Sequence, residues 1–262
     1  MTDGPECAWE RLKAHEIRAA AGGDTVVVVP VAAVEQHGPH LATGTDAIIG
    51  REVALRAARK AAAVRRVLVT PVLWCGLSEH HMAFGGTLTL SPATFQAMLR
   101  DVAVALARQG FERMLISNSH GGNHVAIQAA AEAISMDLGM TVVATTYFRE
   151  DPAALGAHLD DQDGVLHACE AETSMMLALA PDLVDTSDLA AAAGPKDGPT
   201  GAGRASYRWR PFQHLTANGV LGDPSRASAE KGERLLDAAS GAVAALLADP
   251  AVWAPVEDRR RG

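Results

Sequence analysis

Four short segments of the chain are almost entirely apolar and rich in β-branched residues. Runs of this length and composition are typical of strands that are buried on both faces, as in a parallel sheet. The sequence therefore predicts four strands, at residues 25–32, 66–73, 112–117 and 141–147.

Between these segments, apolar residues recur at the spacing of an amphipathic helix. The pattern is clearest at residues 92–109, where Ser91 is a natural N-cap, Pro92 suits the first helical position and Gly110 follows the end. Similar stretches cover residues 48–63 and 125–138. Strands that alternate with helices predict an α/β fold, in which helices flank both faces of a mostly parallel sheet.

One segment, residues 190–203, is rich in Ala, Gly and Pro and has the composition of a linker. However, the chain beyond it contains only one convincing helix, at residues 230–248, which is too little for a second hydrophobic core. We therefore predict a long loop within a single domain, residues 1–262. Residues 1–20 form its N-terminal segment and residues 250–262 its C-terminal tail.

The composition argues against several classes of protein. The chain has 262 residues with 31 acidic and 23 basic side chains, a formal net charge of −8, which disfavours a nucleic-acid-binding surface. The sequence has no run of about 18 uncharged apolar residues that would span a membrane, and no secretory signal pattern. Its three cysteines are too scattered for a disulfide framework or a cysteine zinc site. We expect a soluble, cytoplasmic protein with no nucleic-acid or membrane partner.

Potential metal ligands follow the predicted strands, at the edge of an α/β sheet where sites form. Glu35 and His37 come after the first strand and point to the same side of an extended chain, and Asp46 follows after a turn. His120 follows the third strand, directly before two glycines. Glu172 begins an apolar helix on the face that would be buried, where an unpaired carboxylate is costly. Carboxylates and imidazoles without thiolates suit Zn, Mn or Fe.

Each of these motifs has another interpretation when it is taken alone. Residues 35–37 also suit a surface turn, and His120 with its two glycines a simple strand-to-helix connection. Glu170 suits a solvated position as well as a functional one, and His40 either supports a ligand or caps a loop. Cys169 is disfavoured as a nucleophile because no basic partner is evident. The sequence also lacks the Gly-x-Ser-x-Gly, Gly-x-Gly-x-x-Gly and P-loop motifs.

Taken together, the motifs resemble those of the creatininase (creatinine amidohydrolase) family. The resemblance is carried by three segments: Glu35-Gln36-His37-Gly38-Pro39-His40 with Gly44-Thr45-Asp46, then Asn118-Ser119-His120-Gly121-Gly122-Asn123, then His167 with Glu172-Thr173-Ser174. Residues 219–224 and 229–232 resemble the C-terminal part of the family. The resemblance thus covers about residues 25–245, in the same order.

The resemblance implies a three-layer α/β/α fold and two divalent metal ions per subunit, Zn, Mn or Fe. Glu35, Asp46 and His120 would hold one ion. His37 and Asp46 would hold the other, so that Asp46 bridges the two. In creatininases a glutamate two residues after the His120 position completes the second site, and this chain has a glycine there. We hypothesise that Glu172 takes its place. The resemblance also implies a homohexamer.

The same resemblance implies hydrolysis of C–N amide bonds in small or cyclic substrates. His167 matches the histidine that handles the proton, and Glu172 is assigned to the catalytic group as well as to the metal. The predicted nucleophile is a hydroxide that bridges the two ions, and His167 would protonate the leaving nitrogen. The predicted substrate-binding residues, including backbone N–H groups for an oxyanion, are His81, Gly121, Gly122 and Asn123.

The substrate is less well defined than the chemistry. Creatininases carry tryptophans at two places that read Thr146-Tyr147-Phe148 and Asp163-Gly164-Val165 here, which disfavours creatinine itself. The family also contains deformylases, a peptide-trimming enzyme of redox-cofactor maturation and sugar-ring hydrolases. Two alternative functions fit the same residues. One is a metal-dependent hydrolase of another bond, such as a formamide, a peptide end, a lactone or a ring C–C bond. The other is a non-catalytic metal- or ligand-binding protein.

Overall fold

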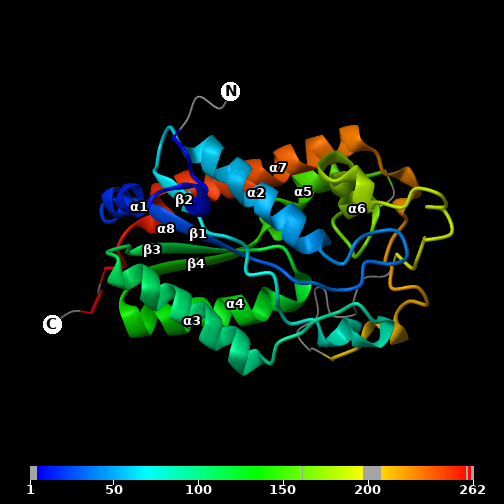
Figure 1. Ribbon diagram of the computed structural model, residues 1–262, viewed down its shortest axis with the longest axis horizontal. Helices are drawn as coiled ribbons and strands as arrows, with labels where there is room; N and C mark the ends of the chain where they lie inside the picture. Colours follow the sequence, from blue (N-terminus) through cyan, green and yellow to red (C-terminus); the bar gives the residue numbers. More distant parts are fainter. Residues whose placement is uncertain (1–4, 161, 197–207, 258, 261–262) are drawn as a thin grey trace.

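A parallel β-sheet forms the centre of the molecule. The computed structural model describes residues 5–160, 162–196, 208–257 and 259–260. The sheet has four strands, β1 (Val26–Val31), β2 (Val67–Val69), β3 (Arg113–Asn118) and β4 (Thr141–Thr146) (Figure 1). Neighbouring strands are parallel, in the order β2-β1-β3-β4. The predicted α/β fold with a parallel sheet is confirmed.

Strand β1 is an interior strand whose side chains are buried on both faces of the sheet. It pairs with β3 from Val26 opposite Arg113 to Val31 opposite Asn118, and with β2 on its other edge. Val26 and Val28 pack into the core on one face, whereas Val27, Val29 and Val31 pack into the core on the other. This double burial explains why the segment has no polar positions.

Helices cover both faces of the sheet and give the three-layer α/β/α arrangement (Figure 1). One layer holds α2 (Thr45–Ala61), α5 (Pro152–Gly156), α6 (Glu170–Leu179) and α7 (Ala229–Ala248). The opposite layer holds α3 (Pro92–Arg108) and α4 (His124–Leu138). Two further short helices are α1 (Ala14–Ala20) and α8 (Pro250–Trp253). Short 3₁₀ turns include η2 (Glu79–Phe84), η3 (Gly121–Asn123), η4 (Tyr147–Arg149) and η6 (Phe212–His214).

Strand β2 is shorter than predicted. The apolar pattern predicts a strand over residues 66–73, but the ladder ends at Val69. Pro71 has no N–H to donate to a neighbouring strand, so it interrupts the regular pairing. Leu73 returns to the sheet only as an isolated bridge with Val31, which turns the following residues toward the carboxyl end of β1.

The two regions expected to lack regular structure differ from each other. Residues 250–253, placed in the C-terminal tail, form α8, and Trp253 is buried with its Nε1 donating to the carbonyl of Leu246. Of the predicted loop at residues 190–203, residues 190–192 form a turn, residues 193–196 have no helix or strand, and residues 197–203 lie outside the described residues.

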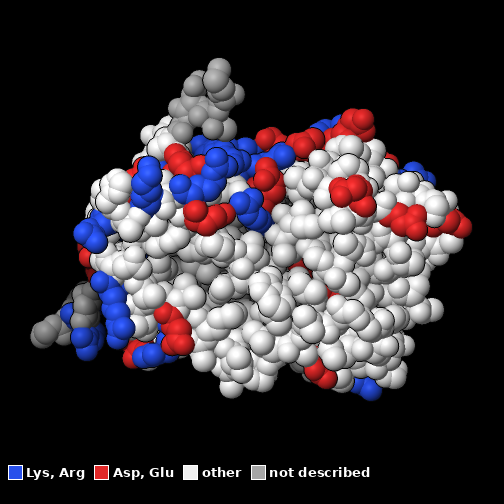
Figure 2. Space-filling model, in the orientation of Figure 1, with Lys and Arg blue, Asp and Glu red and all other residues white. Residues whose placement is uncertain are grey.

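Charged side chains are unevenly distributed over the visible face of the molecule. Figure 2 shows them gathered over the region of α2 and α7, and largely absent from the lower right of the view. Ion pairs link these two helices there, Arg56 with Glu233 and Lys60 with Asp237, each at 2.7 Å. In the described parts of the chain, no helix is both long and apolar enough to cross a membrane.

Candidate metal centre

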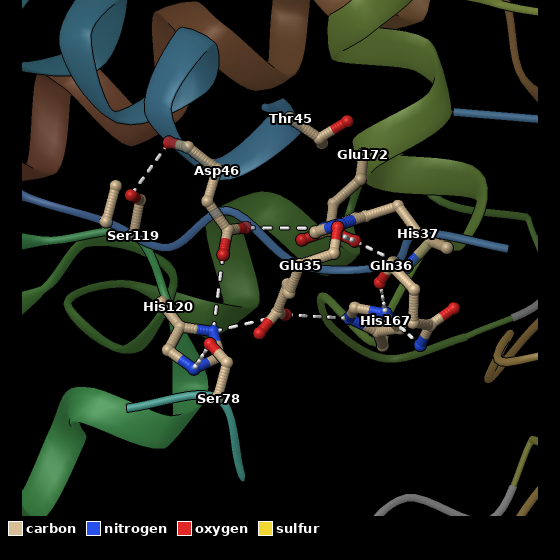
Figure 3. Close-up of polar contacts among 12 residues, drawn as sticks. Glu35, Gln36, His37, Thr45, Asp46, Ser78, Ser119, His120, His167 and Glu172 are labelled. Atoms are coloured by element: carbon tan, nitrogen blue, oxygen red, sulfur yellow. Dashed lines mark hydrogen bonds and ion pairs between the residues drawn. The ribbon is translucent and has the colours of Figure 1, made fainter. Parts of the chain in front are cut away.

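Three buried carboxylates and two buried imidazoles meet at the carboxyl edge of the sheet (Figure 3). Glu35 and His37 follow β1, and His120 follows β3. Asp46 lies in the first turn of α2, because that helix starts at Thr45 rather than at the predicted residue 48. Glu172 lies in the first turn of α6. Each of these five residues is 5% exposed or less.

Asp46 lies between the two imidazoles. Its Oδ1 is 3.3 Å from His37 Nε2, and its Oδ2 is 3.2 Å from His120 Nδ1. Glu35 flanks this arrangement on one side, with Oε1 3.2 Å from His120 Nδ1. Glu172 flanks the other side, with Oε2 3.8 Å from His37 Nε2. The fold therefore brings together the five residues that were predicted as metal ligands from the sequence.

Backbone carbonyls orient both imidazoles. His37 Nδ1 donates to the carbonyl of Glu35 at 3.2 Å, and His120 Nε2 donates to the carbonyl of Leu77 at 3.0 Å. A carbonyl oxygen can only accept, so these nitrogens carry the ring protons. The nitrogens that face the carboxylates, His37 Nε2 and His120 Nδ1, are therefore bare in the neutral rings. Fixing the outward nitrogen in this way is the usual support of a metal-ligating histidine.

Several buried polar atoms at this centre lack partners. Glu35 Oε2, His37 Nε2 and Asp46 Oδ2 accept no hydrogen bond from any part of the chain that the structure describes. An unsatisfied buried polar atom is costly, and several in one place indicate a missing ligand. The ligand atoms of His37, Asp46 and Glu172 lie within 4.8 Å of one another, as do those of Glu35, His80 and His120. This set of oxygen and nitrogen donors fits a divalent metal ion such as Zn or Mn.

The charges at the centre shift one another's pKa values. Burial alone would raise the pKa of Asp46, but the neighbouring His37 and His120 hold it well below its usual range. Burial alone would lower the pKa of His37, yet the Asp46 carboxylate raises it to about 10. Burial raises the pKa of Glu172 to about 7. Positive charge at this point is therefore favoured, and a metal ion would replace the protons on the imidazoles.

His167 lies beside these five residues, and 11% of its side chain is exposed. Its Nε2 donates to the carbonyl of Gln36 at 2.8 Å, which leaves Nδ1 bare, 3.6 Å from Glu35 Oε1. Burial and the neighbouring His37 lower the pKa of His167 well below its usual range. The ring is therefore neutral near pH 7, and its inward nitrogen can accept a proton before it donates one.

Position 122 has no room for a side chain. A Cβ on Gly122 would lie 2.3 Å from the carbonyl oxygen of Leu77 and 2.7 Å from His80 Cε1. The glutamate that the family resemblance places here is thus excluded by the segment that follows β2. The carboxylate nearest to His37, other than that of Asp46, is that of Glu172.

The other predicted substrate residues differ in their surroundings. His81 is 1% exposed and its Nε2 lies 3.3 Å from Glu35 Oε1. Gly121 lies in η3 and is exposed. Asn123 is fully buried, where its Oδ1 accepts from Leu77 N and its Nδ2 donates to Ala32 O. A second bond from Nδ2, to Asn118 Oδ1, uses its remaining hydrogen. The Asn123 side chain therefore links the segments that carry Leu77, Ala32 and Asn118.

Two residues beside the cluster were not predicted. His80 stacks on His120 with an angle of 15° between the rings, and Phe212 packs against His81 with ring centroids 4.0 Å apart. His80 could have been found, because it adjoins His81 in the same segment after β2. The sequence pattern did not indicate Phe212, because this residue lies in an irregular segment far along the chain from the other site residues.

The alternatives at residues 169 and 170 are resolved by burial. Glu170 is fully buried rather than solvated, and it pairs with Lys231 of α7. Cys169 is also fully buried, and burial raises the pKa of its thiol to about 11. A thiol with so high a pKa is a poor nucleophile at neutral pH.

A buried group of carboxylates and imidazoles at the carboxyl edge of a parallel sheet defines a metal-binding α/β/α protein. Known sequences identify the family. The creatinine amidohydrolase (creatininase) family matches residues 10–247. The chain is 32% identical over 252 residues to the creatinine amidohydrolase of Pseudomonas putida, covering 88% of this chain and 90% of the relative.

Other relatives carry different names. The mycofactocin precursor peptide peptidase of Mycolicibacterium smegmatis is 32% identical over 212 residues, covering 80% of this chain and 79% of that protein. The 3-dehydro-scyllo-inosose hydrolase of Thermotoga maritima is 26% identical over 185 residues, covering 67% and 57%.

Solved structures show the same fold with metals. A manganese creatininase and a variant creatininase of the Zn-Zn type match with TM-scores of 0.76 and 0.75. Each is 29% identical to this chain, and the match covers 92% of this chain and 98% of the other. The chain belongs to the creatininase family and is a hydrolase. Together with the ligand set, these structures support binding of divalent metal.

Proposed function

We propose that the chain hydrolyses a C–N amide bond of a small or cyclic substrate with two divalent ions at this centre. Glu35, Asp46 and His120 would hold one ion. His37, Asp46 and Glu172 would hold the other, so that Asp46 is shared. The observation that carries the proposal is the group of buried atoms without partners, Glu35 Oε2, His37 Nε2 and Asp46 Oδ2.

Divalent metal held by these residues would lower the pKa of a bound water toward neutrality and polarise the substrate carbonyl. The chain supplies proton transfer. His167 takes a proton at its bare Nδ1 and returns it to the leaving nitrogen as the C–N bond breaks, while the Nε2–H bond to Gln36 O keeps the ring oriented. Water is added across the C–N bond, giving a carboxylate and an amine. The N–H groups of Gly121 and Gly122 are proposed donors to the oxyanion.

The substrate class is narrowed by the aromatic residues. Neither of the two tryptophan positions of creatininases holds a tryptophan here: the first has Tyr147 and Phe148 of η4, and the second, residues 163–165, has no aromatic side chain. This favours an amide other than creatinine, among them the formamide or peptide-end substrates of the alternative hydrolases. A product screen by mass spectrometry distinguishes a gain of water at C–N from ring opening at a lactone or C–C bond.

Metal analysis with substitution of the shared carboxylate tests the proposal. We expect two transition ions per chain in protein purified without chelator, loss of both in Asp46→Asn, and loss of one in Glu172→Gln. Asp101→Asn, an exposed substitution on α3, is the matched control and should keep both ions. Fewer than one ion per chain with no activation on reconstitution would refute the metal mechanism. Retention of both ions by Glu172→Gln would refute the ligand assignment alone.

The homohexamer and the cytoplasmic location expected from the sequence stay predictions. Mass measurement of the native assembly by light scattering checks the first.

A further inference from the structure

Gln36 lies between two proposed ligands in the sequence but uses its side chain differently. The side chain is 7% exposed, and its amide orientation is fixed by the backbone. Gly38 N donates to Oε1 at 2.9 Å, so that atom is the oxygen. Nε2 donates to the carbonyl of Gly219 at 3.1 Å, so that atom is the nitrogen. The contacts of Oε1 and of Nε2 are therefore both consistent with the same orientation of the Gln36 amide.

This orientation determines which nitrogen of His81 carries the proton. Gln36 Nε2 lies 2.7 Å from His81 Nδ1. An amide nitrogen can only donate, so His81 Nδ1 must accept and is bare. The proton of the neutral ring is then on Nε2, which lies 3.3 Å from Glu35 Oε1 at the centre. His167 Nε2 is also 3.1 Å from Gln36 Nε2, but both nitrogens are donors, so the amide hydrogens go to His81 and Gly219.

His81 therefore carries its proton on the nitrogen that faces the centre, unlike the other three imidazoles. The rings of His37, His120 and His167 each donate outward to a backbone carbonyl and present a bare nitrogen to the centre. His81 accepts from outside and presents an N–H. Its ring cannot readily turn over, because it is 1% exposed and packs against His80, His167 and Phe212 at centroid distances of 4.3, 4.4 and 4.0 Å.

The approach of the C-terminal segment to Gln36 is equally specific. Gly219 has a positive φ of 85°, a conformation that favours glycine. A Cβ at this position would lie 1.9 Å from Gln36 Oε1. The segment can therefore reach the amide only because residue 219 has no side chain.

We propose that Gln36 is a positioning residue that locks His81 in the Nε2–H tautomer. His81 is thereby a hydrogen-bond donor to the centre rather than a metal ligand. With no substrate its N–H faces Glu35, and in the reaction it donates to the oxygen of the amide carbonyl as negative charge develops there. The catalytic part of this inference rests on the proposed amide hydrolysis; the tautomer does not.

Neutron crystallography of the perdeuterated holoenzyme tests the tautomer directly. Deuterium is expected on Nε2 of His81 and not on Nδ1, with the opposite pattern at His37. Deuterium on Nδ1 of His81 would overturn the inference. If the protein holds no metal and cleaves no amide, the proposed function fails, yet the same neutron map still tests the tautomer.

Substitution of Gln36 tests the consequence for catalysis. Gln36→Glu keeps an oxygen for Gly38 N but puts an acceptor in place of the donor to His81 Nδ1, which favours the neutral tautomer with the proton on Nδ1 and a bare inward Nε2. We expect kcat to fall about 100-fold, the usual cost of one oxyanion donor, with little change in KM or metal content. Gln36→Met, which removes the donor without adding charge, should also lower kcat.

The matched control for Gln36→Glu is Gln128→Glu, and two outcomes would contradict the proposal. Gln128→Glu makes the same change on α4, where Gln128 Nε2 lies 3.4 Å from His124 Nε2, and should leave kcat unchanged. A loss of kcat in Gln36→Glu alone, with Gln36→Met unaffected, would assign the effect to the added charge and overturn the proposal. A loss that only follows a loss of metal would overturn it too, because Gln36 would then act on the ligands.

Discussion

Asn123 shows how one side chain can orient a proposed metal ligand, His120, without contacting it through its own side chain. Its Oδ1 accepts from Leu77 N at 2.9 Å, and the carbonyl of Leu77 in turn accepts from His120 Nε2 at 3.0 Å. Asn123 therefore acts through the backbone of one residue to hold the His120 ring with Nδ1 inward. Such supporting bonds commonly matter nearly as much as the ligands themselves. The motif predicts Asn123 as a substrate-binding residue, and its bond to Leu77 could not be predicted because the position of Leu77 depends on tertiary structure.

His40 leads to a prediction about the pH dependence of stability. It is 4% exposed, and its Nε2 bonds to Thr173 Oγ1 at 2.9 Å. Burial lowers the pKa of His40 from 6.5 to about 4, with the charge of His37 adding to the effect. The unfolded chain then binds more protons than the folded protein below pH 6.5. This contribution to stability is present above pH 6.5 and is lost as the pH falls toward 4.

The measurement is urea denaturation of metal-free protein between pH 7 and pH 4. His40→Gln should lose less stability over this range than the parent protein, by roughly 2 kcal/mol. His15→Gln, a change of an exposed histidine on α1, should follow the parent protein. Equal slopes for His40→Gln and the parent would contradict the assignment.

At the scale of elements, the contact between α6 and α7 positions Glu172. A Cβ at Gly232 would lie 2.0 Å from the carbonyl oxygen of Ser174, so the two helices meet backbone to backbone. Lys231, one residue earlier, bonds to the buried Glu170 and to Asp160. Glu170 is in the same turn of α6 as Glu172, so this ion pair fixes the start of the helix that carries the proposed ligand.

Removal of the lysine should be costly for this reason. Lys231→Met leaves Glu170 fully buried without its cation, a change that typically costs about 3–5 kcal/mol. Lys60→Met is the matched control, because Lys60 forms an ion pair with Asp237 of α7 at the surface, where such pairs contribute about 0–1 kcal/mol. Chemical denaturation compares the two. A cost for Lys231→Met no larger than that for Lys60→Met would show that the buried pair does not hold the helices.

The elements were largely predictable, and the exceptions have physical causes. The helices predicted at residues 92–109 and 230–248 differ by one residue at most from α3 and α7, because apolar periodicity and Ser N-caps define them locally. Strand β2 was overestimated because Pro71 breaks a ladder that the apolar pattern alone would continue. The Lys231–Glu170 pair joins residues 61 positions apart, and a sequence pattern does not report such contacts.

At the scale of the whole molecule, the site lies at the carboxyl edge of the sheet, beside the helical layer that holds α2 and α6. Glu35, His37 and His120 were predictable because the carboxyl ends of parallel strands share one edge. Asp46 and Glu172 come from helices of one layer, and an acid on an apolar helical face was the signal for Glu172. Phe212 completes the surroundings of His81 from a segment with no periodic pattern, so only the folded chain places it.

The surface ion pairs and the buried carboxylates of the proposed metal centre have different roles in stability. The ion pairs between α2 and α7 lie at the surface (Figure 2), where water screens them. The carboxylates of Glu35, Asp46 and Glu172 are buried, and atoms of the centre lack partners. A cation that binds them stabilises only the folded state, because unfolding returns the carboxylates to water. The stability of the whole molecule should therefore depend on metal.

Calorimetry with and without metal measures that dependence. Zn²⁺ or Mn²⁺ at about 100 times its Kd should add about 2.7 kcal/mol to the free energy of unfolding, because only the folded state binds it. For a chain of this length that is a rise in Tm of roughly 5–10 °C over chelator-treated protein. Asp46→Asn should show little of this rise, since it removes the shared ligand, whereas Asp101→Asn should show all of it. The same Tm for chelated and metal-loaded parent protein would mean that the buried centre is not a metal site.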